Sequence, residues 1–169
     1  MDSYEALAAS YDWLTEDGEY GKRPDFAEKL FRRAKRTVKS LVDLVCGTGT
    51  MTVRFAGRGY MVTGVDYSPE MLAQAQQKLA AIDPPPLLLC QSMPQLRLLD
   101  SVDAAICCLD SINYLTRPRA VPRTFNRLPA TIAPGGSLVF DLPPVSHMAQ
   151  LPGEVLRADH ETAFYTRPH

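Results

Sequence analysis

The chain has 169 residues, which is enough for one domain with a real core and leaves no room for a second substrate domain. Its hydrophobic content of 46% and charged content of 22% exclude the disordered and fibrous classes. A formal net charge of −1 provides no overall attraction to polyanions or membranes.

Residues 1–39 are expected to form an N-terminal helical lid, with a short helix ending near Ser10 and a glycine-containing loop after it. A second helix is predicted from Pro24 toward Thr37, because proline suits the first helical turn. It carries a basic cluster, made of Lys29, Arg32, Arg33, Lys35, Arg36 and Lys39. A solvated helix face is the preferred interpretation of this cluster, and an RNA-facing surface is the alternative.

Residues 40–142 are expected to form the core of the domain. The predicted strands are 40–45, 61–65, 87–91, 102–109 and 137–142. Predicted helices run from Thr50 to a C-terminal cap at Gly59, from Ser68 to about Ala81, and after Pro118, and the turn 133–136 precedes the last strand. This alternation predicts an α/β fold, a doubly wound and mainly parallel sheet of five to six strands. The runs 87–91 and 102–109 are nearly all apolar, which predicts strands covered on both faces.

The remaining residues, 143–169, show little pattern. They suggest one short helix and one edge strand within 154–165, and thus an incomplete C-terminal part of the same single domain.

The most informative stretch is Leu41–Thr50, an apolar strand followed by a turn that contains Gly47 and Gly49. Seventeen residues after Gly49, Asp66 ends the second predicted strand. Glycines let the backbone approach a ligand, a helix start offers free N–H groups, and a carboxylate can accept both hydroxyls of a ribose. The pattern therefore predicts one half of a nucleotide-type site.

With these residues in view, the chain resembles the class I, S-adenosylmethionine-dependent methyltransferases, whose sheet is Rossmann-like. The resemblance covers roughly residues 4–142 through five motifs in order, namely 43–49, 64–72, 90–93, 109–115 and 133–136. A single GxG would be weak evidence, but five motifs at suitable spacing are specific. The resemblance implies S-adenosylmethionine as cofactor and methyl transfer to a small-molecule acceptor.

The resemblance also implies roles for individual residues. Asp43 would hold the methionine ammonium, directly or through water, and Asp66 would accept the ribose hydroxyls. The methionine and ribose would be lined by Cys46, Gly47 and Gly49. The implied residues around the adenine are Tyr67 and Met71 on one face and Ser92 and the Met93 backbone at its polar edge. Two further residues would complete the pocket, Leu109 along the methionine chain and Tyr11 as a cover.

Four departures from the family pattern stand out. Val45 replaces the usual Gly or Ala, and Ser92 replaces the usual Asp. Pro122 and Pro129 fall inside the predicted fourth helix, so we expect it to be short or broken. Family members normally complete a seven-stranded sheet with two further strands, and His169 comes too soon for both. We therefore expect either a truncated product or a partner, such as a second copy, that covers the exposed sheet edge.

The acceptor side is less well specified. Asp110, Asn113 and Tyr114 follow a strand end, where ligands bind in such sheets, and are candidates to face the substrate, although ordinary loop roles are equally compatible with them. The candidate bases are Asp110, Tyr114, Tyr11 and His147, and no catalytic residue is assigned.

Two other functions remain open. A nicotinamide-dependent dehydrogenase would need a third glycine where Thr52 stands, and Asp43 suits an ammonium better than a pyrophosphate. A non-catalytic S-adenosylmethionine-binding module is favoured by Val45 and by the short C-terminus.

The cysteines show no metal-binding spacing, and Cys107 and Cys108 are expected to be core residues on opposite faces of one strand. We therefore predict no metal site. The polar start of the chain shows no signal segment, so a cytoplasmic location is expected, without a nucleic-acid or membrane partner.

Overall fold

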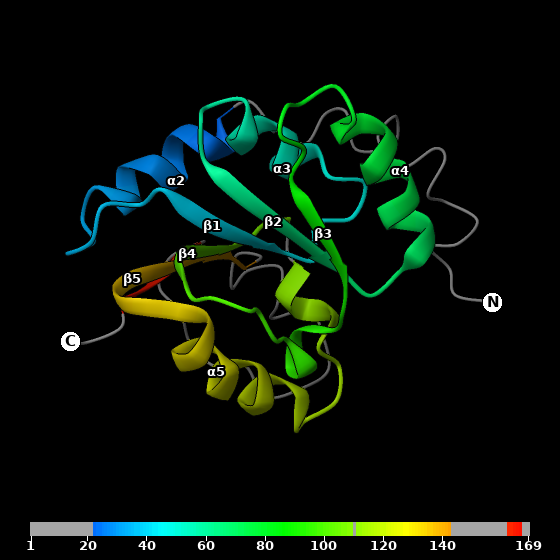
Figure 1. The fold of residues 1–169 in the computed structure, drawn as a ribbon. Coiled ribbons are helices and arrows are strands. Elements are labelled where there is room, and N and C mark those ends of the chain that lie inside the picture. Colours follow the sequence, from blue (N-terminus) through cyan, green and yellow to red (C-terminus); the bar gives the residue numbers. More distant parts are fainter. Residues whose placement is uncertain (1–21, 110, 143–161, 167–169) are drawn as a thin grey trace.

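The computed structural model describes residues 22–109 and 111–142, together with the backbone of 162–166. A six-stranded sheet in the order β3-β2-β1-β4-β5-β6 forms the centre of the molecule (Figure 1). The strands are β1 (Ser40–Leu44), β2 (Met61–Asp66), β3 (Leu87–Cys90), β4 (Val102–Cys107), β5 (Ile132–Asp141) and β6 (Thr162–Thr166). The first five pair in parallel and β6 is antiparallel to β5, which confirms the predicted α/β class.

Helices lie on both faces of the sheet (Figure 1). They are α2 (Arg23–Phe31), α3 (Thr50–Ala56), α4 (Pro69–Leu79) and α5 (Ala120–Thr131), with short 3₁₀ helices η2 (Met93–Gln95) and η3 (Ser111–Tyr114). Neighbouring residues of β1 enter different cores, because side chains alternate along a strand. Leu41 packs with α2 and α3 on one face, and Val42 packs with Leu128 of α5 on the other.

The predicted helix from Pro24 to Thr37 is too long, because α2 ends at Phe31. Most of the basic cluster therefore lies after the helix. Within that segment, Asp103 accepts hydrogen bonds from the side chain of Arg36, from the backbone of Lys39 at 2.9 Å and from that of Ser40 at 3.0 Å. These bonds fix the connection from α2 into β1 against the start of β4.

The fourth predicted helix is not broken, contrary to expectation. In α5, Pro122 occupies the first turn, where backbone N–H groups have no intrahelical partner, so it costs no bond. Pro129 removes one donor close to the C-terminal end, where the Thr131 hydroxyl bonds the carbonyl of Arg127 at 3.0 Å. A proline is therefore tolerated at each end of a 12-residue helix.

Two strands also differ from the prediction. Strand β3, at the edge of the sheet, is only partly covered instead of buried on both faces, and Leu87 is 55% exposed. The predicted turn at 133–136 is instead an irregularity inside β5, which begins at Ile132. There a Cβ on Gly136 would lie 2.3 Å from the carbonyl of Asp103, so only glycine permits this approach of two strands. In contrast, β4 is buried throughout, as predicted.

Among the described residues, no helix is long and apolar enough to cross a membrane.

Candidate functional site

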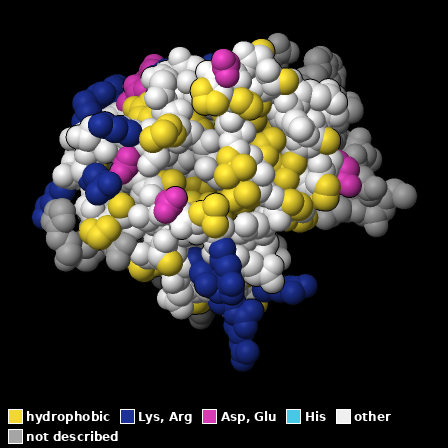
Figure 2. All heavy atoms as spheres, in the orientation of Figure 1, with side chains coloured by type: hydrophobic (Ala, Val, Ile, Leu, Met, Phe, Trp, Pro, Cys, Tyr) yellow, Lys and Arg dark blue, Asp and Glu magenta, His cyan; other side chains and the backbone are white. Residues whose placement is uncertain are grey.

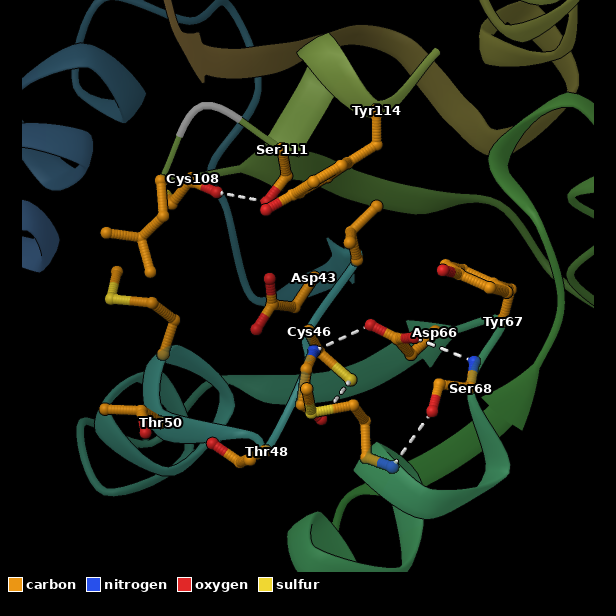
Figure 3. Close-up of a pocket in the computed structure, with 15 residues that line it drawn as sticks. Asp43, Cys46, Thr48, Thr50, Asp66, Tyr67, Ser68, Cys108, Ser111 and Tyr114 are labelled. Atoms are coloured by element: carbon orange, nitrogen blue, oxygen red, sulfur yellow. Dashed lines mark hydrogen bonds between the residues drawn. The ribbon is translucent and has the colours of Figure 1, made fainter. Parts of the chain in front are cut away.

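The carboxyl-terminal ends of β1, β2 and β4 open into one cavity, as expected for an open α/β sheet (Figure 3). Eight of the predicted site residues line it: Asp43, Cys46, Gly47, Asp66, Tyr67, Met71, Leu109 and Tyr114. In Figure 3, Asp43 and Asp66 lie on the sheet side of the space, and the ring of Tyr114 lies on the opposite side. The topology thus brings together residues separated by more than 70 positions in the sequence.

The loop after β1 has an unusual backbone. Val45, Gly47 and Gly49 all have positive φ, at 59°, 54° and 78°. A Cβ on Gly47 would meet nothing within 4 Å, so this residue borders open space. Gly49 does not line the cavity, because it begins α3 and a Cβ there would lie 3.0 Å from that of Ala75 in α4. The two glycines therefore differ: one opens the cavity, and the other allows two helices to pack closely.

Asp66 ties the ends of β1 and β2 together. One carboxylate oxygen accepts the N–H of Gly47 at 2.9 Å, and the other accepts that of Ser68 at 2.9 Å. The side chain is 3% exposed, and burial raises the pKa of Asp66 above its usual range, against the effect of these N–H donors. The backbone of Tyr67 also bonds this carboxylate, which can accept about four hydrogen bonds, so some acceptor capacity remains toward the cavity.

Asp43, next to the last residue of β1, is a second buried carboxylate. Thr52 donates its hydroxyl to Asp43 at 2.7 Å, from the first turns of α3. Burial raises the pKa of Asp43 to about 7, a rise that the Thr52 bond reduces and the charge of Asp66 increases. A cation placed here would favour the ionised form.

A lysine from α4 holds the glycine loop from outside. Lys78 donates to the hydroxyl of Thr48 at 3.2 Å and to that of Thr50 at 2.9 Å. Ser68 caps α4 at its other end by accepting the N–H of Met71 at 3.2 Å, as predicted. The loop is thus fixed by α4 as well as by the sheet.

The opposite wall is the turn after β4. Leu109 adopts a φ of 62°, and its N–H donates to Asp141 at 3.0 Å. Asp141, at the end of β5, also pairs with Arg23, the first residue of α2. Ser111 closes the turn by donating to the carbonyl of Cys108 at 2.6 Å. One carboxylate therefore links α2, β5 and the turn that carries Leu109.

A second cavity adjoins the first, since Val45, Tyr67 and Tyr114 line both. Ser92 and Met93, two of the predicted site residues, line this second cavity. Its other lining residues are Gln91, Pro94, Leu115, Thr116, Arg117 and Ala120. The two cavities together form a continuous site over the ends of four strands.

Some of the predicted residues do not contribute to the described walls. Asn113 lines neither cavity, and Tyr11, Asp110 and His147 lie outside the described residues. Sequence reasoning also missed several lining residues, namely Val45, Thr48, Thr50, Met51, Ser68, Cys108 and Ser111. Cys108 packs against the core on the side of α2 and α3, as its alternation with Cys107 predicts, and it also lines the cavity because it follows the end of β4.

The cysteines in the cavity are poor nucleophiles. Burial raises the pKa of the Cys46 and Cys108 thiols well above their ordinary value, and the charge of Asp43 raises both further. Cys107 packs in the opposite core, as its strand position predicts. Across 22–109 and 111–142, no group of three or more His, Cys, Asp or Glu side chains is placed to hold a metal ion.

Comparison with known proteins gives a consistent result. YqeM of Bacillus subtilis (strain 168), provisionally named a methyltransferase, is 36% identical over 82% of this chain and 55% of its own length. An S-adenosylmethionine-dependent methyltransferase from Clostridium acetobutylicum ATCC 824 superposes with a TM-score of 0.76 at 29% identity, over 88% of this chain and 61% of that one. CalS10, an amino pentose methyltransferase from Micromonospora echinaspora, superposes with a TM-score of 0.69 at 27% identity, over 79% and 56%.

The chain therefore spans somewhat more than half the length of these relatives. The family model described as "Methyltransferase domain" matches residues 41–136, which contain the glycine loop, both buried carboxylates and the walls of both cavities. This chain belongs to the methyltransferase domain family.

Proposed function

We propose that the protein binds S-adenosylmethionine in the continuous site and transfers its methyl group to a small-molecule acceptor. The observation that carries this proposal is the pair of buried carboxylates, Asp43 and Asp66, on either side of Gly47 in one cavity. A cationic amino-acid end and a ribose are the two groups of this cofactor that carboxylates recognise.

The residues present fit the cofactor. The open space beside Gly47 admits a ligand against the backbone, because no side chain within 4 Å would meet a Cβ there. Asp66 retains acceptor capacity toward the ribose hydroxyls, while its bonds to backbone N–H groups, among them those of Gly47 and Ser68, fix its orientation. Asp43, held by Thr52, lies buried where an ammonium would stabilise its ionised form.

The remaining roles divide between the two cavities. In the first, Cys46 and Leu109 would lie along the methionine chain. Toward the second, Tyr67 would cover the adenine, with Ser92 and the Met93 backbone at its polar edge. Met71 lines only the first cavity, so we assign it to the ribose side of the adenine face.

Bound S-adenosylmethionine supplies a methyl group on a sulfonium, which is a strong donor without a metal. The work left to the protein is to hold an acceptor in line with that group and to exclude water. Tyr114 is a candidate for this, since it lines both cavities and faces the two carboxylates across the first. We assign no general base; Tyr114 is the candidate within the described walls, beside Tyr11, Asp110 and His147.

The nicotinamide alternative is less compatible with this geometry. Thr52 stands where the dinucleotide-binding pattern requires a third glycine, and it bonds the buried Asp43. A carboxylate at this place would repel a pyrophosphate and attract an ammonium.

Isothermal titration calorimetry with each cofactor tests the proposal. We expect S-adenosylmethionine and its demethylated product to bind, and NAD and NADP not to bind. Binding of a nicotinamide dinucleotide without S-adenosylmethionine would refute the assignment. Cofactor binding without methyl transfer to any of a panel of amines, phenols and sugars would favour a binding module instead.

A further inference from the structure

Lys78 lies beside the glycine loop without lining either cavity. It is the only lysine or arginine of α4, and it is half-buried. In Figure 2, dark-blue side chains gather where α2 and α5 lie in Figure 1, whereas the surface over α4 shows yellow and white atoms. The fold therefore turns this cation toward the loop that it binds.

The packing of α4 fixes the place from which this side chain starts. Ala75 and Leu79 lie on the same side of the helix, and both are buried. A Cβ on Gly49 would lie 3.0 Å from the Cβ of Ala75 and 3.7 Å from a methyl carbon of Leu79. Lys78 follows Ala75 by three residues and so belongs to the same side of the helix. Its side chain therefore starts close to the loop.

Lys78 places a positive charge directly behind the wall of the first cavity. Its ammonium donates to the hydroxyl of Thr50 at 2.9 Å and to that of Thr48 at 3.2 Å. Both threonines line the cavity, and they flank Gly49 in the chain. A partly buried charge is screened less by salt than an exposed one, so this ammonium can act on a group inside the wall.

The wall that Lys78 supports belongs to the part of the site away from the second cavity. Tyr67 lines both cavities, whereas Thr50 lines only the first. In Figure 3, Thr50 lies on one side of Asp43, and Asp66 and Tyr67 lie on the other. With the ribose at Asp66 and the ammonium at Asp43, as proposed, the amino-acid end of the cofactor points toward Thr50.

The charges at this end call for a cation. The amino-acid end carries a carboxylate on the same carbon atom as its ammonium, and two acidic side chains, Asp43 and Asp66, line the same cavity. Like charges at close range in a poorly solvated space repel each other. Lys78 is placed to offset this repulsion, since its ammonium binds hydroxyls that form the wall.

We infer that Lys78 is a positioning residue for the carboxylate of the cofactor, acting by its charge and through the hydroxyls of Thr48 and Thr50. This inference rests on the proposed function, because it treats the first cavity as the place of the cofactor's amino-acid end. It divides that end between two groups: Asp43 takes the ammonium, and Lys78 with its two threonines takes the carboxylate.

The test compares three thioether ligands by calorimetry. S-adenosylhomocysteine carries both the ammonium and the carboxylate, its decarboxylated analogue carries only the ammonium, and 5′-methylthioadenosine carries neither. Lys78→Met should bind S-adenosylhomocysteine about 3–10-fold more weakly, since a partly screened charge interaction is lost, and should not weaken the other two. Asp43→Asn should weaken the two ligands that have an ammonium and spare 5′-methylthioadenosine.

Two further variants serve as controls. Lys78→Arg keeps the charge and should keep the preference for S-adenosylhomocysteine over its decarboxylated analogue. Arg54→Met removes an exposed cation from the last turn of α3 and should leave this preference unchanged. Urea unfolding of each variant reports its stability, and Lys78→Gln provides a second neutral side chain if Lys78→Met does not fold.

The ratio of affinities separates the possible outcomes. Equal weakening of all three ligands in Lys78→Met would mean that the lysine only supports the loop, and it would overturn the inference. An unchanged affinity for S-adenosylhomocysteine would also overturn it, as would the same loss of preference in Arg54→Met. If the unmodified protein bound none of the three ligands, the proposed function itself would fail.

Discussion

The affinity for S-adenosylmethionine should depend on pH through Asp43. Burial raises the pKa of this carboxyl to about 7 in the free protein, so only about a tenth of it is ionised at pH 6 and about three-quarters at pH 7.5. An ammonium binds the ionised form, and apparent affinity scales with the fraction of protein that is competent to bind. The dissociation constant should therefore fall about eightfold between pH 6 and pH 7.5.

Above that range the affinity should decrease again. The α-amino group of the cofactor has an ordinary pKa near 8, so it loses its charge as the pH rises further. The profile should thus have a maximum between about pH 7 and pH 8. Calorimetry at half-unit steps in a buffer series of constant ionic strength would measure it, with the heat of buffer protonation subtracted.

Two variants test the assignment of this profile. In Asp43→Asn the rise between pH 6 and pH 7.5 should vanish, leaving weak binding that changes only with the cofactor. In Thr52→Val the carboxyl loses a hydrogen bond that lowers its pKa, so the rise should move to higher pH. A flat profile in the unmodified protein, or an unchanged rise in Asp43→Asn, would refute the reasoning.

Three further predictions concern other parts of the structure. Gly49→Ala should lower the free energy of unfolding by about 1–3 kcal/mol, since it combines a positive φ with a 3.0 Å contact to α4; unchanged stability in urea would contradict this. Burial alone would raise the pKa of Asp103, but Arg36 and backbone N–H groups lower it to about 2. The carboxylate should therefore contribute about 2 kcal/mol of stability, which is lost as the pH falls from about 4 to 2. Asp103→Asn should remove that pH-dependent loss in acid-unfolding curves, and an identical curve would show that the carboxylate is not responsible. Asp141→Asn keeps an acceptor for the N–H of Leu109, so it should bind S-adenosylmethionine better than Asp141→Leu does. Equal binding by both variants would mean that this contact does not position the cavity wall at Leu109.

The sheet and its site could be predicted because local and global signals agree. The apolar run before Gly47 and the carboxylate at Asp66 mark strand ends, and parallel strands bring such ends to one edge. Ser68, followed by Pro69, also marks a helix start that the structure has. Gly47 and Asp66 in the first cavity could therefore be predicted from order and spacing, whereas Cys46, Tyr67, Met71 and Leu109 were implied by the family resemblance.

The differences arise where tertiary contacts overrule local pattern. The apolar composition of β3 does not reveal that it lies at a sheet edge, because only the strand order decides this. Helix α2 ends at Phe31, and the segment after it bonds to Asp103, which is distant in the sequence. Likewise, the local pattern places Gly49 at the ligand. Its packing against Ala75 cannot be read from that pattern, because it depends on where α4 lies.

The most direct test of the central claim is the affinity of an Asp66→Asn variant for S-adenosylmethionine, measured by calorimetry at pH 7.5. The amide keeps one acceptor for the loop N–H groups but loses the charge, so we predict binding about 10–100-fold weaker than in the unmodified protein. Asp100→Asn, a change of the same kind at an exposed position, should have no effect. An unchanged dissociation constant in Asp66→Asn would contradict the claim that this carboxylate holds the ribose.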